Sequence, residues 1–241
     1  TLTSVVATLP ARCGKENIMS IRRYFDQQLS DLRDRILLMG SRVRDELNLA
    51  LAALAALDME KAQAVFAADR VVNETRFEIE EICFTLIVTQ QPAARDLRTI
   101  IAAMNVIVDL ERMGDQAKGI AKVVPHLVQN PTQERPPELR QMGEIVGKML
   151  ADTMTAYATN DTDLAREIAG RDDQVDALYA QVFYKILGQM ASAGTPEKAE
   201  SVYEVLRVAR ELERFGDLAT NVAERVIYLV TGAHLELNVD S

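Results

Sequence analysis

The chain has 241 residues, of which 48% are hydrophobic, 26% are charged and only 5% are aromatic, with no tryptophan. This composition is typical of an all-helical protein, and the length is sufficient for one or two domains with a substantial core. The formal net charge of −9 argues against a nucleic-acid partner, because nucleic-acid binding relies on lysine and arginine, and it slightly favours cation binding.

Cysteine content and hydropathy indicate the cellular compartment of the protein. The two cysteines, Cys13 and Cys83, are too few for a disulfide framework or a thiolate metal site. No apolar stretch reaches the roughly 18–20 residues that cross a bilayer, and the amino end lacks the basic region of a secretory signal. We therefore expect a cytoplasmic protein without direct membrane insertion.

The first elements of the chain are an irregular start and a long helix. Residues 1–18 are weakly patterned, and we expect them to be an N-terminal extension before an ordered protein that opens at Met19. From Phe25 onward, apolar residues recur every three or four positions. This periodicity predicts one long amphipathic helix that ends near Leu57.

Two further helices complete the first half of the chain. Asp58 is a suitable N-cap for the second helix, which we predict to extend to about Val88. The sequence Gln-Gln-Pro at 90–92 predicts a turn. A third helix follows over residues 93–124, and we expect Pro125 to stop it.

The second half of the chain repeats this plan after a linker. Residues 125–137 contain four prolines and several polar residues, which is typical of a connection between domains. Asp161 is a suitable N-cap within the second half. The helices predicted there cover about 138–159, 162–192 and 197–230, and residues 233–241 form a C-terminal tail.

Two nearly identical hexapeptides indicate an internal duplication. Leu-Glu-Arg-Met-Gly-Asp occupies residues 110–115, and Leu-Glu-Arg-Phe-Gly-Asp occupies residues 212–217, which lie 102 residues further along. Short loops between long helices make antiparallel neighbours. We therefore predict an all-α fold of two tandem three-helix bundles, residues 19–124 and 138–232, related by pseudo-two-fold symmetry.

Each hexapeptide places two carboxylates four residues apart on one helix face, Glu111 with Asp115 and Glu213 with Asp217. Like charges at this spacing cost roughly 0.2–0.5 kcal/mol per pair, so their presence in both repeats suggests that the oxygens have a use.

Earlier in each repeat, a spacing of 103 residues pairs Asp69 with Asp172 and Asn73 with Asp176. The second repeat thus has another Asp-x-x-x-Asp motif, which is half replaced by asparagine in the first.

A mid-helix glycine also stands in each hexapeptide, at Gly114 and Gly216. Glycine at such a position costs about 1 kcal/mol relative to alanine. Close approach of another backbone or of a ligand would explain its presence.

In its plan and its motifs the chain resembles the PhoU family, accessory and regulatory proteins of bacterial phosphate-specific transport. The resemblance covers about residues 19–232. It rests on the two three-helix repeats, on Gln-Pro-Ala-Ala-Arg-Asp-Leu-Arg at 91–98 opening a helix, and on the doubled hexapeptide.

The resemblance implies a non-catalytic, cytoplasmic negative regulator of phosphate uptake and of the phosphate-starvation response. Such a regulator links the phosphate ABC transporter to a membrane sensor histidine kinase. The expected partners are therefore transporter subunits, the kinase and a second copy of the chain in a homodimer, without nucleic acid.

The resemblance also implies surface metal ions, bound by paired Glu/Asp-x-x-x-Asp motifs from neighbouring helices. In this chain one cluster would draw on Asp69, Asn73, Glu111 and Asp115, and the other on Asp172, Asp176, Glu213 and Asp217. Oxygen ligands of this kind suit Mg²⁺, Mn²⁺ or ferric iron rather than tetrahedral zinc.

The first cluster departs from the family pattern in two places. Asn73 offers a neutral amide oxygen, which is a weaker ligand than a carboxylate, and Gly119 stands where Asn221 continues the second motif. We therefore expect the first metal site to be the weaker one.

Two other interpretations of the carboxylates stay open. Arginine and lysine lie three residues from several of them, so these faces could be ordinary solvated surfaces with ion pairs. The same reasoning favours structural ion pairs over phosphate binding for Arg98, Arg112 and Arg214. The alternative function is a carboxylate-bridged metal-dependent enzyme or a metal-storage bundle.

The sequence gives that alternative little support. The Glu-x-x-His motif of ferritin-like di-iron proteins is absent, because valine and threonine stand three residues before the only histidines, His126 and His234. Phosphate-binding glycine loops, nucleophile elbows and zinc-protease motifs are absent as well. We predict that the protein is not an enzyme and has no catalytic residues.

Overall fold

The structure, a computed structural model, describes residues 12–130, 135–233 and 237, and within these ranges it contains helices and no strands. The all-α prediction is therefore confirmed. The six helices are α1 Arg12–Ala56, α2 Met59–Gln90, α3 Ala94–Gln129, α4 Glu138–Thr159, α5 Thr162–Ala191 and α6 Pro196–Thr231. In the described part of the chain, no helix is both long and apolar enough to span a membrane.

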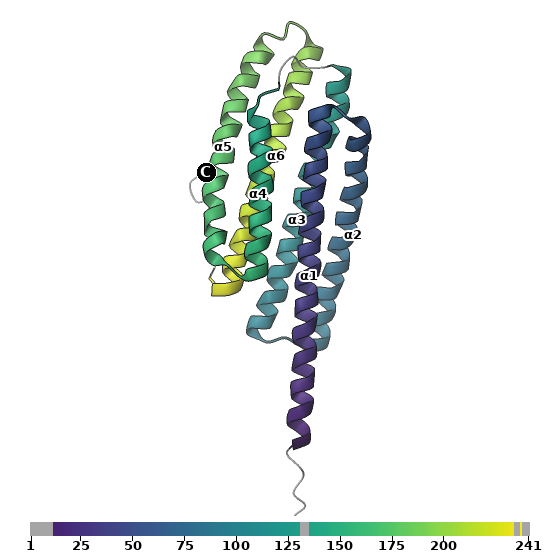
Figure 1. Cartoon of the computed structure of the whole chain (residues 1–241), viewed down its shortest axis with the longest axis vertical. Coiled ribbons are helices and arrows are strands. Elements are labelled where there is room, and N and C mark those ends of the chain that lie inside the picture. The colour runs from purple at the N-terminus through teal and green to yellow at the C-terminus, as the bar shows by residue number, and fades with distance from the viewer. Residues whose placement is uncertain (1–11, 131–134, 234–236, 238–241) are drawn as a thin grey trace, which may run out of the picture.

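The six helices form two bundles of three that lie side by side along their length (Figure 1). Helices α1 to α3 make the first bundle and α4 to α6 the second, while α3 packs on α6 and α1 packs on α4 across the boundary. Both of these pairs run antiparallel in Figure 1. This arrangement is the predicted pseudo-two-fold relation between the repeats.

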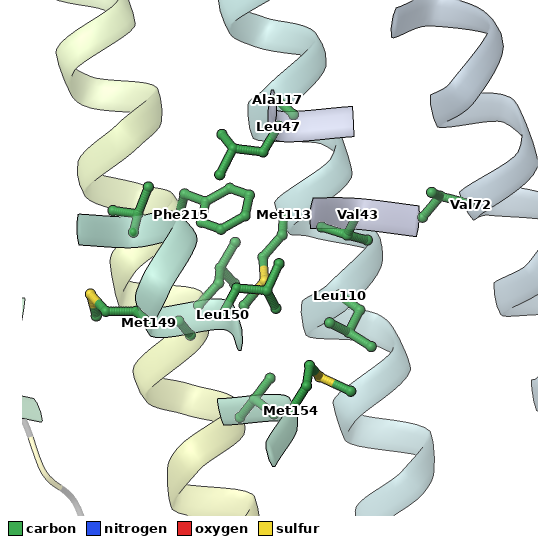
Figure 2. Packing of buried hydrophobic residues seen from close by; sticks show 14 of the residues in the cluster. Val43, Leu47, Val72, Leu110, Met113, Ala117, Met149, Leu150, Met154 and Phe215 are labelled. Carbon is green, nitrogen blue, oxygen red and sulfur yellow. The ribbon is translucent and has the colours of Figure 1, made fainter. Parts of the chain in front are cut away.

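The two bundles share one hydrophobic core. A single cluster of buried side chains includes members of all six helices. Met113 and Phe215, which occupy the same position of the two hexapeptides, are fully buried in it. Figure 2 shows them gathered with Leu47 of α1 and Leu150 of α4. The two repeats are therefore packed around one shared core rather than around two separate cores.

Aspartate caps fix the start of the second helix in each repeat, as predicted. Asp58 accepts hydrogen bonds from the backbone N–H groups of Glu60 and Lys61, and Asp161 does the same for the corresponding groups at the start of α5. Such caps satisfy backbone donors that have no partner within the helix.

The predicted end of the third helix at Val124 is wrong. Helix α3 continues through Pro125 to Gln129, so the predicted linker begins as helix. Proline removes one backbone donor and crowds the preceding turn. However, Val123, Val124 and Leu127 are buried in the core, and this packing holds the last turns in helical form.

The two chain ends also differ in part from expectation. Helix α1 begins at Arg12, seven residues before Met19, so the predicted extension is helical from that residue on, and its first eleven residues lie outside the described ranges. In Figure 1 this end of α1 projects beyond the bundle. Of the predicted tail, Ala233 and Leu237 are described. The Leu237 backbone N–H donates to Glu224 Oε1 at 2.7 Å.

Candidate functional site

The hexapeptides lie in the middle of α3 and α6, with one side in the core and one side toward solvent. Their leucine, their Met or Phe, and their glycine are buried in both repeats. Glu111, Glu213 and Asp217 are partly exposed, and Asp115 is exposed. The two helices therefore present carboxylates along their outer sides, next to α2 in the first repeat and α5 in the second.

In the first repeat, Lys118 binds the carboxylates directly. Its Nζ donates to Oδ2 of Asp69 at 2.7 Å and to Oδ1 of Asp115 at 3.4 Å, which joins α2 to α3. Arg76 Nη1 lies 3.7 Å from Oε2 of Glu111. Three of the four predicted ligands thus lie near one another, and lysine and arginine balance their charge.

Asn73, the fourth predicted ligand of this repeat, uses its side chain differently. Its Nδ2 donates to the backbone oxygen of Asp69, four residues earlier in α2. The amide group is therefore tied to its own helix through its nitrogen.

Glu46 of α1 belongs to the same region but was not predicted. It is 1% exposed, and neither carboxyl oxygen has a hydrogen-bond partner among the described residues. Burial, together with the nearby Asp69 and Asp115, raises the pKa of Glu46 to about 9, although Lys118 acts in the opposite direction. The sequence offered one signal, because Glu46 interrupts the apolar stripe of α1 next to Leu47.

In the second repeat, the carboxylates influence one another. Asp172 is 2% exposed, whereas Asp176, Glu213 and Asp217 are partly exposed. Burial raises the pKa of Asp217 to about 6, and Glu213 and Asp176 add to this effect. Burial also raises the pKa of Glu213, with Asp176 and Asp172 contributing. All four predicted ligands of this repeat therefore share one electrostatic environment.

Arginines moderate the charge of the second repeat. Arg210 and Arg214 both lower the pKa values of Glu213 and Asp217, against the effect of burial. A lysine like Lys118 is missing at the corresponding position, which is Thr220.

The two hexapeptide glycines face carboxylate oxygens. A Cβ atom on Gly114 would lie 3.1 Å from Oε2 of Glu46, and one on Gly216 would lie 2.9 Å from Oδ1 of Asp172. The expected close approach is therefore made by acidic side chains of neighbouring helices. A close approach also explains the glycine at position 119, because a Cβ atom there would lie 2.6 Å from Cδ of Glu211 in α6.

The segment at 91–98 joins three helices. Asp96 accepts a hydrogen bond from Arg22 of α1 at 2.6 Å. The Arg98 guanidinium lies 5.7 Å from the ring centroid of Tyr228 and lies against Gly232 at the end of α6. A cation is favourable at a helix C-terminus. This segment therefore has a structural role at the base of the fold.

The donor chemistry of the two repeats fits a metal ion unequally. In the described part of the chain, no three His, Cys, Asp or Glu side chains lie together closely enough to hold a metal ion. The four carboxylates of the second repeat have the all-oxygen character that hard cations prefer. In the first repeat, the Lys118 ammonium already stands between Asp69 and Asp115.

Comparison with known proteins agrees with this duplicated helical architecture. A model of the PhoU domain matches residues 36–124 and 139–226, one match in each repeat. The chain belongs to the PhoU family.

Relatives match the chain over most of its length. A phosphate-specific transport system accessory protein PhoU homolog of Clostridium acetobutylicum is 35% identical over 90% of this chain and 99% of the relative. A homolog of the same name from Streptococcus pneumoniae is 37% identical over 90% of this chain and 100% of the relative. These relatives are named as accessory proteins rather than as enzymes, in agreement with a non-catalytic chain.

Solved structures show the same fold. The crystal structure of the phosphate transport system regulatory protein PhoU from Streptococcus pneumoniae matches with a TM-score of 0.81 at 35% identity, over 88% of this chain and 99% of that chain. The crystal structure of PhoU from Pseudomonas aeruginosa matches with a TM-score of 0.82 at 36% identity, over 87% of this chain and 100% of that chain.

Proposed function

We propose that this protein is a cytoplasmic, non-catalytic regulator that represses phosphate uptake and the phosphate-starvation response when phosphate is plentiful. The observation that carries the proposal is the similarity, over about 90% of this chain, to proteins named as accessory and regulatory proteins of phosphate transport. In this role the protein acts as a homodimer and binds subunits of the phosphate ABC transporter and a sensor histidine kinase.

The proposal includes a cation at the carboxylates of the second repeat. Asp172, Asp176, Glu213 and Asp217 would hold Mg²⁺, Mn²⁺ or ferric iron, which would neutralise carboxylates that raise one another's pKa values. The corresponding set in the first repeat, Asp69, Asn73, Glu111 and Asp115, is the weaker candidate. The support lies in the ligand chemistry and in the shared electrostatic environment of the second set.

A pull-down experiment tests the partner proposal. The purified full chain, metal-loaded or stripped with chelator, is presented to the transporter ATPase subunit and to the cytoplasmic part of the kinase. Elemental analysis of each sample gives its metal content. We expect specific capture of at least one partner. If neither partner is captured by the metal-loaded or by the stripped protein, the proposal is contradicted.

A pair of variants tests whether the second carboxylate face takes part. Asp217→Asn removes a charge from this face, whereas Asp163→Asn removes one from an exposed position at the start of α5. We expect weaker metal retention for Asp217→Asn and unchanged retention for Asp163→Asn. Equal retention by both variants and the parent chain would place the metal elsewhere.

A further inference from the structure

The outer side of helix α2 has large apolar side chains that no other helix covers. Among the described residues, α2 packs on α1 and α3 alone, and in Figure 1 it forms one edge of the molecule. Phe77 and Phe84 stand seven residues apart on one side of this helix and are 61% and 60% exposed. Val88, one turn further on, is exposed as well. Large apolar side chains gathered on one side of a helix are typical of a binding surface.

Helix α3 extends this apolar surface. Two ion pairs, Lys118 with Asp69 and Arg76 with Glu111, align the antiparallel helices, and the residue numbers of both pairs add up to 187. Residue 84 of α2 is therefore level with residue 103 of α3. Ile101 lies near this level and is exposed. Residues 99–108 of α3 contain no charged side chain, so the apolar surface continues onto α3.

The charged side chains within this surface are glutamates. From residue 77 to residue 93 the chain has no lysine or arginine and three glutamates, which are Glu78, Glu80 and Glu81. In the described part of the chain, none of the three forms an ion pair. Arg76 borders the surface, with its guanidinium 5.4 Å from the ring centroid of Phe77, but it pairs with Glu111. We call this surface the α2–α3 face and define it by Phe77, Glu80, Glu81, Phe84, Val88 and Ile101.

The second repeat shows that the shared fold does not require these glutamates. At the spacing of 103, Glu80 corresponds to Phe183 and Glu81 to Tyr184. Apolar side chains are exposed there too, including Tyr184 and Tyr203. The acidic charge is therefore a property of the first repeat's surface and not of the duplicated architecture.

The glutamates narrow the choice of partner. In a symmetric dimer formed through the α2–α3 face, the glutamates of both copies would meet, and like charges across an interface are unfavourable. The lipid head groups of the cytoplasmic leaflet and nucleic acids are negative as well. A partner with apolar and basic side chains gains from both features of the face.

We propose that the α2–α3 face binds a basic amphipathic helix of another protein. The apolar side of that helix packs on Phe77, Phe84 and Ile101, in the way that amphipathic helices occupy apolar grooves. Its lysines or arginines pair with Glu80 and Glu81, which stand between the two phenylalanines along α2. Apolar contact then supplies most of the affinity, and charge selects the partner. The inference stands without any of the partners or metals of the proposed function.

Binding of two synthetic helical peptides to the full chain tests the proposal. Each fluorescently labelled peptide has about 18 residues, or five helical turns, with leucine at the spacing of an amphipathic helix. One has lysine at its other positions and the second has glutamate there. We expect fluorescence anisotropy to show binding of the leucine–lysine peptide and no binding of the leucine–glutamate peptide.

A pair of double variants tests the apolar contact. Phe77→Ser/Phe84→Ser is expected to weaken binding of the leucine–lysine peptide by at least about tenfold, because the central aromatic anchors are lost. Tyr184→Ser/Tyr203→Ser removes two exposed aromatic side chains of the second repeat and is the matched control. We expect the control to bind with the Kd of the parent chain.

A second pair separates the charge of the α2–α3 face from the net charge of the chain. Glu80→Gln/Glu81→Gln removes two negative charges from the face, whereas Glu144→Gln/Glu167→Gln removes two from exposed positions of α4 and α5. We expect only the first variant to weaken binding of the leucine–lysine peptide. The difference between the two variants is expected to shrink at high salt, because salt screens exposed charges.

Three results would overturn the inference. One is a folded full chain that does not bind the leucine–lysine peptide. Another is an equal loss of binding in the phenylalanine and tyrosine double variants. The third is sedimentation of the parent chain as a dimer and of Phe77→Ser/Phe84→Ser as a monomer, since a second copy would then cover the face. Circular dichroism checks that each variant is folded, and if the double serine variant is not, Phe84→Ala alone provides the same test.

Discussion

At residue scale, the carboxyl group of Glu46 is buried without a hydrogen-bond partner among the described residues. The corresponding residue of α4 is Met149, which is fully buried and apolar. The pKa of Glu46 is raised to about 9, whereas an unfolded chain has a glutamate pKa of about 4.3. Its stabilising contribution is therefore complete below about pH 4 and declines as the pH rises through about 9.

We predict that Glu46→Met stabilises the protein, and more so at alkaline pH. An unsatisfied buried polar group costs about 1–3 kcal/mol even when it is neutral, and the raised pKa of Glu46 adds a cost that grows as the pH rises above about 4, so the free energy of unfolding is expected to rise by more than that amount at pH 8. The gain is expected to shrink toward pH 4. Chemical denaturation at several pH values measures it. Exposed Glu144→Met is the control, and a gain that is the same at every pH would contradict the interpretation.

The sequence predicted the carboxylates of both repeats and the cations three residues away on the same helix, such as Lys118 beside Asp115, but not the cations that reach the carboxylates from a neighbouring helix. The hexapeptides identify Glu111 and Asp115 because a four-residue spacing fixes their common helix face. Which side chain of a neighbouring helix reaches them depends on how the helices rotate against each other. The pairing of Arg76 with Glu111 therefore had no signature in periodicity, and neither did that of Lys118 with Asp69.

At element scale, the helix glycines have two different environments. Gly216 of α6 faces the Asp172 carboxylate, and a Cβ atom there would also lie 3.6 Å from Val146. Gly170 of α5 has no atom within 4 Å of the position that its Cβ would take. Alanine is favoured over glycine in a helix by about 1 kcal/mol, so only local packing can reverse the preference.

We predict opposite effects for the same substitution at these two glycines. Gly170→Ala is expected to raise the free energy of unfolding by about 0.5–1 kcal/mol, because nothing opposes the helix preference. Gly216→Ala is expected to lower it by about 1 kcal/mol, since overpacking outweighs that preference. Urea denaturation of both variants measures the difference, and stabilisation by Gly216→Ala would show that Asp172 moves aside without cost.

Helix boundaries show where local sequence signals are sufficient. The aspartate caps at Asp58 and Asp161 were predictable because capping involves only neighbouring residues. The passage of α3 through Pro125 was not predictable, because the burial of Val124 and Leu127 outweighs the tendency of proline to end a helix. That burial becomes visible only when α3 is packed against its neighbours.

At the scale of the whole molecule, the shared core couples the two repeats. Side chains of both repeats enter one cluster, and α3 and α1 pack directly on α6 and α4. The duplication in the sequence predicted two bundles, but it did not indicate how much surface they would share. Buried apolar residues such as Met113 and Phe215 form that surface. Periodicity predicts that they are buried, but it does not predict whether they pack within their own repeat or against the other repeat.

We predict that the full chain unfolds in one cooperative transition. Five of the six tyrosines lie in the second repeat, and Tyr24 is the exception. Tyrosine fluorescence therefore reports mainly on the second repeat, whereas circular dichroism reports on all helices. Coincident urea transitions by the two probes are expected. A fluorescence transition well separated from the dichroism transition would show that the repeats unfold independently.

Deletion of the gene tests the central claim most directly. In the organism that carries this chain, the deletion strain is grown with abundant phosphate, and phosphate uptake is measured together with a reporter of the phosphate-starvation response. We predict that uptake and reporter activity both rise and that the intact gene restores them to parental levels. Uptake and reporter activity equal to those of the parent strain would contradict a role as negative regulator.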